Sequence, residues 1–371
     1  MNTAHRAADA TPTSTVTRFN APGVRSLVWD GDTLVDWVDG GARWTLEGEH
    51  SDPSVRYAFS FDMATSLPGS PYSVIYKRLG TKGLVLNDGR VVRELNRSFY
   101  QAEAYEYPIA LLRLPSGRPA IAHCPDDYNR LRIDDLETGA VIASASDEAA
   151  DFFHSRLAVS PDGRWLASAG WIWHPVDDVG LYDLEAALTD GAALDKSRAD
   201  LDVLTETGNA AGFDSKSRLL VTADRSGWAD DDAPLTDAHG GSCLVRLAAG
   251  QPGAPERWPL AFDAPFMAIG ADHLLLFAGT PSLVCIETGQ EVATWPDIPV
   301  RLPSSAIQRG DTEFTPIACD LARSRVAIAQ GDQISIIAFE LATSGPTRVA
   351  APPHRRRPKA ITARRAITPA R

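Results

Sequence analysis

The sequence lacks the long apolar runs of a membrane protein. No run approaches the roughly 18–20 residues that a spanning helix needs, and HLLLFAG (273–279) is among the longest in the 371-residue chain. The first 13 residues, MNTAHRAADATPT, are polar and have no apolar core of the kind found in signal peptides. We therefore expect a cytoplasmic protein without membrane contact, whose residues 1–13 are disordered.

Cysteine is also scarce, and the cysteines do not form a metal-binding pattern. They are Cys124, Cys243, Cys285 and Cys319, and none belongs to a CxxC pair. Each lies in or beside an apolar, strand-like run, which predicts a buried reduced thiol, whereas a zinc site needs closer ligand spacing. The chain also lacks GxGxxG, Walker and GxSxG motifs. We expect no metal and no cofactor, and no motif identifies a catalytic residue.

Basic residues are few except at the C-terminus. The net charge is −12, yet residues 346–371 hold eight Lys or Arg and no acid, which leaves 28 cations against 48 acids in the rest of the chain. Because phosphates repel an acidic body, nucleic-acid binding by that body is disfavoured. Residues 351–371 lack apolar periodicity and are predicted to be a disordered basic tail, the one segment suited to nucleic acid, an anionic surface or the acidic body itself.

What the sequence does contain is a repeated pair of strands. An apolar strand, a tight polar or glycine turn and a second strand recur seven times. The copies span residues 34–46, 83–95, 131–144, 179–191, 243–260, 283–295 and 334–350. Their turn glycines lie 39–59 residues apart, close to the repeat length of a four-stranded propeller blade. Two further strand-like runs precede each copy, most clearly in RLAVSPDGRWLASAG (156–170).

These repeats resemble the blades of WD40-type β-propellers of the divergent bacterial kind. The resemblance rests on SPDGRWLASAG, LYDLE and the turns LRIDDLETG and LVCIETGQ, although LYDL and RIDDL stand where a Trp-Asp pair would be. It covers residues 14–350 and implies an all-β, seven-bladed propeller of four-stranded antiparallel blades; a double-sheet sandwich is the main alternative. VTRFN (16–20) is expected to begin the first blade, TRVAAP (347–352) to end the last, and DLEAAL (183–188) to form at most one helical turn.

The resemblance also implies that links between blades and loops between second and third strands share one face. On that face we expect the links NRSFYQAEAYEY (96–107) and SDEAADFFH (146–154) and the loops at 124–129, 171–178 (WIWHPVDD) and 225–242. Aromatic and acidic side chains in such loops are typical of a protein-binding surface and favour a basic partner. The predicted contact residues of blades 3–5 are Tyr105, Tyr128, Phe153, Trp171, Trp173, His174, Asp177, Asp178, Trp228, Asp230, Asp231 and Asp232.

We therefore expect a protein-interaction scaffold. In a more modest interpretation, these aromatic side chains only pack each long loop onto its own blade. The alternative function is that of a propeller enzyme, a metal-assisted hydrolase or lyase with its site at the channel mouth. Its candidate residues are His154, His174, Asp178, Asp230 and His239. Neither the identity of a partner nor an oligomeric state follows from these patterns.

Overall fold

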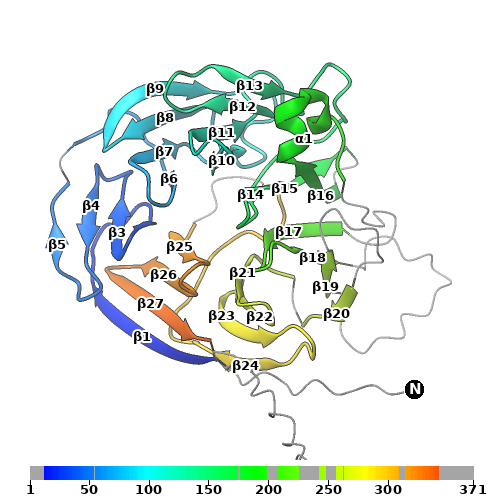
Figure 1. Ribbon diagram of the computed structural model, residues 1–371. Coiled ribbons are helices and arrows are strands. Elements are labelled where there is room, and N and C mark those ends of the chain that lie inside the picture. Colours follow the sequence, from blue (N-terminus) through cyan, green and yellow to red (C-terminus); the bar gives the residue numbers. More distant parts are fainter. Residues whose placement is uncertain are drawn as a thin grey trace, which may run out of the picture.

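The structure, a computed structural model, is a ring of seven antiparallel sheets (Figure 1). It describes residues 12–53, 55–173, 176–198, 207–224, 242–247, 256–261, 263–308 and 314–341. Within blades 1 to 6, the strands follow one another outward from the ring centre in chain order, whereas the outermost strand of blade 7 comes from the start of the described chain. The all-β, seven-bladed propeller predicted from the sequence is confirmed, and the sandwich is not observed.

Blades 1 to 3 each have four strands. Blade 1 contains β2 (Val28–Asp30), β3 (Thr33–Asp36), β4 (Ala42–Trp44) and β5 (His50–Ser51). Blade 2 contains β6 (Met63–Ser66), β7 (Tyr72–Tyr76), β8 (Lys82–Asn87) and β9 (Arg90–Asn96). Blade 3 contains β10 (Ile109–Arg113), β11 (Pro119–His123), β12 (Arg132–Asp135) and β13 (Val141–Ser144). The strands of blade 1 are the shortest of the three sets, a difference that shapes the surface between blades 1 and 2.

Blade 4 departs from the four-stranded pattern among the described residues. It contains β14 (Leu157–Val159), β15 (Trp165–Ile172) and β16 (Val176–Asp183), followed by α1 (Leu184–Thr189) and the 3-10 turn η1 (Gly191–Leu194). Asp183 caps α1, because its carboxylate accepts a hydrogen bond from the Ala186 N–H. The expected helical turn is thus confirmed. In the described part of the blade, α1 and η1 stand where the other blades have their fourth strand. No helix among the described residues is long and apolar enough to cross a membrane.

Blades 5 to 7 complete the ring. Blade 5 contains β17 (Thr207–Phe213), β18 (Leu219–Asp224), β19 (Ser242–Leu247) and β20 (Glu256–Pro259). Blade 6 contains β21 (Phe266–Ile269), β22 (His273–Ala278), β23 (Thr280–Cys285) and β24 (Glu291–Thr294). Blade 7 contains β25 (Ile317–Asp320), β26 (Arg325–Gln330), β27 (Gln333–Glu340) and, as its outermost strand, β1 (Thr13–Asn20).

The ring is closed by β1, in contrast to the sequence prediction. VTRFN was expected to be the inner strand of blade 1, but it pairs antiparallel with β27, from Thr13↔Glu340 to Asn20↔Gln333. This pairing covers the edge of β27 and joins the start of the chain to the last blade, which leaves fewer open edges. β1 starts one residue before the expected boundary at 14. The predicted outer strand at 347–352 and the basic tail at 351–371 lie outside the described residues.

The core lies between blades, because alternate side chains of each strand point to opposite faces of the sheet. In β8, Leu86 packs toward blade 1 in a cluster with Val35, whereas Val85 packs toward blade 3 in a cluster with Ile121. All four side chains are essentially inaccessible to solvent. Burial of each such side chain contributes about 1.5–3 kcal/mol, so the stability of the ring comes mainly from contacts between neighbouring blades.

The four cysteines are free thiols. Cys124 and Cys243 are buried as predicted, whereas Cys285 is half-buried and Cys319 is exposed. Burial raises the pKa of the Cys124 thiol, which keeps it protonated and unreactive.

Candidate functional site

The stretch WIWHPVDD is mostly a strand hairpin and not the loop that the sequence suggested. β15 continues to Ile172 and β16 begins at Val176, with Trp171 paired to Asp177. On its other side Trp171 pairs with Phe153, through hydrogen bonds from Phe153 N–H to Trp171 O (2.8 Å) and from Trp171 N–H to Phe153 O (3.2 Å). Gly170 permits this approach, since a Cβ there would lie 2.0 Å from Phe153 O.

Six aromatic side chains form a cluster at the end of blades 3 and 4 where β11 connects to β12 and β15 connects to β16. Its members are Tyr100, Tyr105, Tyr128, Phe153, Trp171 and Trp173. Phe153 lies at the centre, stacked on Trp171 at 3.8 Å and on Tyr128 at 4.0 Å between ring centroids. Tyr105 meets Phe153 edge-on at 5.6 Å. Stacked and edge-on pairs stabilise beyond area burial alone, so the cluster forms a rigid base.

The outer edge of this aromatic cluster is open to solvent. Trp173 is 41% exposed and Tyr100 is 46% exposed, and the neighbouring Phe99 is 82% exposed. Tyr100 contacts Phe153 at 6.0 Å and Trp173 at 6.4 Å between centroids, so two of the three exposed rings rest on the buried ones. We call Phe99, Tyr100 and Trp173 the aromatic patch.

The structure divides the predicted contact residues into three groups. Trp173 is exposed and Tyr128 is half-buried, whereas Tyr105, Phe153 and Trp171 are buried and support the patch from beneath. Asp177 is buried and Asp178 half-buried on β16. Outside the described residues lie His174, Trp228, Asp230, Asp231 and Asp232. The link at 96–107 was expected on this face, and Phe99 and Tyr100 lie in it, but these two residues were not chosen among the predicted contacts.

Acidic side chains lie in the two loops that carry Tyr128 and Phe153, and some of them are paired. Asp151 accepts a hydrogen bond of 2.7 Å from the Tyr128 hydroxyl. Burial, followed by that hydrogen bond, raises the pKa of Tyr128 to about 12, so its hydroxyl stays protonated. Arg132 bonds to Asp126 at 2.9 Å, and Arg130 pairs with Asp147 at 2.7 Å. These exposed pairs are individually weak and leave the surface net acidic.

A segment from the far side of the ring covers the inner side of the aromatic cluster. Residues 295–308, which follow β24, run toward blade 4 (Figure 1), and residues 304–308, here called the crossing segment, reach the cluster. Ile307 pairs with Tyr105, and the Ala306 N–H donates to Asp177 Oδ1 at 2.9 Å. The Gln308 N–H donates to Ala104 O at 2.7 Å. The crossing segment therefore explains why Tyr105 is buried.

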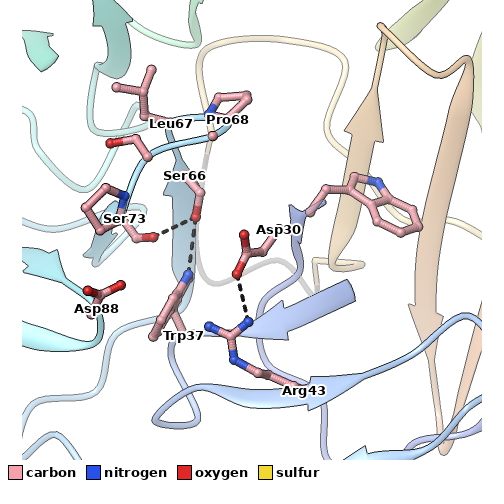
Figure 2. Close-up of a pocket in the computed structure, with 12 residues that line it drawn as sticks. Asp30, Trp37, Arg43, Ser66, Leu67, Pro68, Ser73 and Asp88 are labelled. Atoms are coloured by element: carbon pink, nitrogen blue, oxygen red, sulfur yellow. Dashed lines mark hydrogen bonds and ion pairs between the residues drawn. The ribbon is translucent and has the colours of Figure 1, made fainter. Parts of the chain in front are cut away.

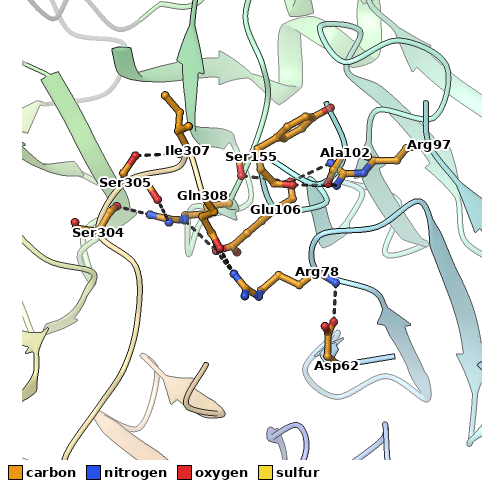
Figure 3. Close-up of polar contacts among 12 residues, drawn as sticks. Asp62, Arg78, Arg97, Ala102, Glu106, Ser155, Ser304, Ser305, Ile307 and Gln308 are labelled. Atoms are coloured by element: carbon orange, nitrogen blue, oxygen red, sulfur yellow. Dashed lines mark hydrogen bonds and ion pairs between the residues drawn. The ribbon is translucent and has the colours of Figure 1, made fainter. Parts of the chain in front are cut away.

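Buried polar contacts hold the crossing segment in place (Figure 3). Arg156 donates to the backbone oxygens of Ser304, at 2.6 Å, and Ser305. Glu106 accepts from Arg156 Nε at 3.3 Å and from Gln308 Nε2 at 2.8 Å, and the Gln308 Oε1 accepts from Arg78. Because these charges are desolvated, removal of one partner leaves another uncompensated, which fixes the geometry strongly.

Arg97 fixes the link that carries Phe99 and Tyr100. Its guanidinium donates to the backbone oxygen of Ala102 at 2.8 Å (Figure 3). It also donates to the backbone oxygen of Tyr105 at 2.9 Å and lies over the Tyr105 ring at 4.5 Å. Arg97 is 4% exposed. The link is thus anchored from within, which positions the patch on an ordered backbone.

Asp178 on β16 and His154, just before β14, both have strongly shifted pKa values. Burial raises the pKa of Asp178 to about 6, opposed by the hydrogen bond from the Val179 N–H. Burial lowers the pKa of His154 to about 3, so the imidazole is neutral at physiological pH. The His154 Nδ1 lies 3.2 Å from Ser168 Oγ. No group of three or more His, Cys, Asp or Glu suited to a metal ion occurs in the part of the chain that the structure describes.

A polar cavity of about 320 Å³ lies between blades 1 and 2 (Figure 2). Its polar side chains are bonded to one another: Arg43 Nη1 donates to Asp30 at 2.7 Å, and Trp37 Nε1 donates to Ser66 Oγ at 3.2 Å. Ser66 is bonded in turn to Ser73 at 2.7 Å. Because these groups already satisfy one another, we assign no ligand to this cavity.

Comparison with known proteins supports the fold alone. No family model matches the chain, and no curated protein does. Among solved structures it is similar to a catalytically inactive virginiamycin B lyase from Staphylococcus aureus with quinupristin, at 10% identity and a TM-score of 0.51, over 88% of this chain and 99% of that one. A streptogramin B lyase matches at 9% identity and a TM-score of 0.49, over 88% and 98%. At 10% identity the likeness to the first of these structures supports the fold and nothing finer.

Proposed function

We propose that this protein is an interaction scaffold that holds a protein partner at the aromatic patch. The proposal rests chiefly on one observation: Tyr100 and Trp173 are 46% and 41% exposed on a base of buried aromatic rings, and Phe99, next to Tyr100 in the chain, is 82% exposed. Large aromatic anchors surrounded by polar groups are typical of the energetically dominant residues in protein interfaces. Single exposed aromatic residues are unremarkable, but three together favour a docking role.

The rigidity of the patch supports this proposal. Arg97 anchors the link that carries Tyr100, and the crossing segment packs against the inner side of the cluster through Ala306 and Ile307. A partner that binds here does not have to order a flexible loop first. Binding to a pre-organised surface therefore loses less conformational entropy and gains affinity.

The charge around the patch favours a basic partner. Residues 126–132 and 146–151 contain five acidic side chains and two arginines. Complementary charge speeds association and suppresses acidic competitors, an effect that salt weakens. The proposed partner therefore presents Lys or Arg side chains around an apolar contact.

Affinity capture from native extract with the full chain tests the proposal. The patch variant Tyr100→Ala/Trp173→Ala is compared with the control Val141→Ala/Val292→Ala, which shortens two exposed side chains on outer strands, 56% and 37% exposed. We expect a protein retained by the wild type and the control but lost by the patch variant. The purified partner should bind more weakly as salt is raised. A partner retained equally by the patch variant would exclude the patch as its contact.

A catalytic role is a second candidate, favoured by the raised pKa of Asp178. A carboxyl pKa of about 6 lies in the range useful to a general acid or base. As a metal-assisted hydrolase or lyase, the protein would retain a stoichiometric metal after purification and lose both metal and activity in Asp178→Asn. Tyr100→Ala/Trp173→Ala would leave that activity intact. The opposite pattern, partner loss without any metal or activity, supports the scaffold.

A further inference from the structure

An apolar groove of about 780 Å³ lies on the outer part of blade 2, on the side that faces blade 1. It exists because blade 1 is too small to cover its neighbour. β4 has three residues and β5 has two, whereas β8 and β9 have six and seven. The outer part of the blade 2 sheet therefore extends beyond the strands that would normally pack against it.

The floor of the groove is the sheet surface itself. Leu84 of β8 and Val91 of β9 line it, and the side chain of Val91 is 50% exposed. The neighbouring Val92 is 49% exposed. These two adjacent half-exposed valines leave an apolar stretch on an outermost strand that otherwise carries Arg90, Arg93 and Glu94.

The opposite wall is aromatic and comes from the link between blades 1 and 2. Tyr57, Phe59 and Phe61 line it, and Phe59 is 49% exposed. The wall is anchored to the floor, since the Tyr57 hydroxyl donates to Gly89 O at 3.2 Å. Phe61 is buried in the cluster of Ile75 and Leu86, so the wall is continuous with the core. The groove is thus built from ordered side chains.

The rim of the groove is basic although the molecule is acidic. Arg56, Lys82 and Arg90 line it together with one acid, Glu94, and all four side chains are exposed. Lys82 donates to the neutral Asn96 side chain. The whole chain has a net charge of −12, so this local excess of positive charge is unusual. It favours a ligand that carries negative charge.

We propose that this groove docks an extended, apolar segment of a protein partner that also carries acidic residues. The apolar side chains enter between Val91 and the aromatic wall, and the acidic residues meet Arg56, Lys82 and Arg90. β9 is the last strand of its sheet, with no strand partner on its outer side among the described residues. An extended segment there is able to pair with the β9 edge by strand addition. This inference is independent of the aromatic patch.

The test uses fluorescent peptides of about six to ten residues, the length of a typical strand. Leu and Val alternate in them with Glu, Gln or Lys, and binding to the full chain is followed by anisotropy. We expect the Glu series to bind most tightly and the Lys series at least about tenfold more weakly. Raising the ionic strength should weaken the Glu series selectively.

Two variants with the same charge change locate the site. Val91→Asp places a carboxylate in the groove, and Val141→Asp places one on β13, the outer strand of blade 3, where the wild-type side chain is 56% exposed. We expect Val91→Asp to weaken the Glu peptides at least about tenfold and Val141→Asp to leave them unchanged. Phe59→Ala should weaken all apolar peptides without changing the preference for Glu.

Three outcomes would overturn the proposal. One is that Lys peptides bind as tightly as Glu peptides, and another is that the two aspartate variants have equal effects. The third is concentration-dependent self-association of the protein that Val91→Asp abolishes, which would make the groove an interface between two copies of this chain. Sedimentation of the peptide-free protein distinguishes this last case.

Discussion

Two surfaces of the ring expose aromatic side chains, and they differ in what lies beside them. At the aromatic patch, Tyr100 and Trp173 contact buried rings, and a segment from the far side of the ring fills the space next to them. At the groove of blade 2, Phe59 faces open space, because the strands of blade 1 end too early to fill it. The aromatic patch is therefore an exposed surface that rests on buried side chains, whereas the groove of blade 2 is a depression that no neighbouring strand fills.

This difference shows how a propeller gains binding surfaces without change to its core. Residues 295–308, which follow the last strand of blade 6, add material to one end of the ring, and the short strands of blade 1 leave a gap at its side. Both changes leave the interblade clusters intact, since Leu86 and Ile121 remain fully buried. Function of this kind is carried by links and strand lengths, in keeping with the tendency of loops to carry function on a rigid scaffold.

The largest expected effect is a difference in the free energy of unfolding between an alanine variant at the aromatic cluster and one at the groove. Phe153→Ala removes the central ring of the aromatic cluster, which is 0% exposed, and should lower the free energy of unfolding by about 3–5 kcal/mol. Phe59→Ala, at a side chain 49% exposed, should cost less than about 1 kcal/mol. Urea unfolding of both variants measures the difference. Equal costs would show that the cluster is no better supported than the groove.

The crossing segment gives the next largest effect. Glu106→Ala leaves Arg156 without its carboxylate partner in a mostly buried site and should cost about 3 kcal/mol. Hydrogen exchange at the Gln308 and Ala306 N–H groups should speed up more than elsewhere. Glu256→Ala is the control, since its pair with Arg246 is solvent-exposed on the glutamate side and worth at most about 1 kcal/mol. A similar cost for both would contradict a buried network.

A smaller effect comes from pH. The pKa of Asp178 is about 6 in the folded protein against an ordinary 3.8, so the folded state holds its proton more tightly than the unfolded state. Its contribution to stability is present below about pH 4 and lost as pH rises through about 6. Asp178→Asn should therefore be about 1–2 kcal/mol more stable than the wild type at pH 7, and the gain should shrink toward pH 4. A variant that is less stable at pH 7 would contradict the burial of this carboxylate.

The smallest expected effects are those of the exposed contact residues themselves. Phe99→Ser and Val91→Ser should each change the free energy of unfolding by no more than about 0.5 kcal/mol, because both side chains are at least half exposed. Thermal unfolding checks this prediction. Each variant should nevertheless weaken binding at its own surface only, and loss at both surfaces would show that the two are coupled.

The sequence predicted the fold because the blade repeat is local. Alternating apolar residues and tight turns such as PDG and ETG can be recognised in windows of about ten residues. The same alternation predicts which side chains are buried between blades. Ring closure was not predicted, since the pairing of Val16 with Ile337 joins the two ends of the chain. No local pattern distinguishes an outer strand of the last blade from an inner strand of the first.

The grouping of the aromatic side chains was predicted in part, but for a different reason. The resemblance to WD40-type propellers implied that Trp173, Tyr128 and the link at 96–107 share one face, and the structure brings Tyr100 of that link together with Trp173 and Tyr128. The burial of Tyr105 was not predictable, because its cover is Ile307, distant in sequence. Likewise, the groove depends on the shortness of β5, which is a matter of strand length and not of any motif.

Site-specific photo-crosslinking tests the central claim, that the aromatic patch contacts a protein partner. A photo-reactive phenylalanine analogue replaces Phe99, which is 82% exposed, or Val141 as a control on blade 3, 56% exposed. After irradiation in native extract, we predict a discrete crosslinked protein with a basic contact surface from position 99 and none from position 141. The same product from both positions, or no product from position 99, would contradict the claim.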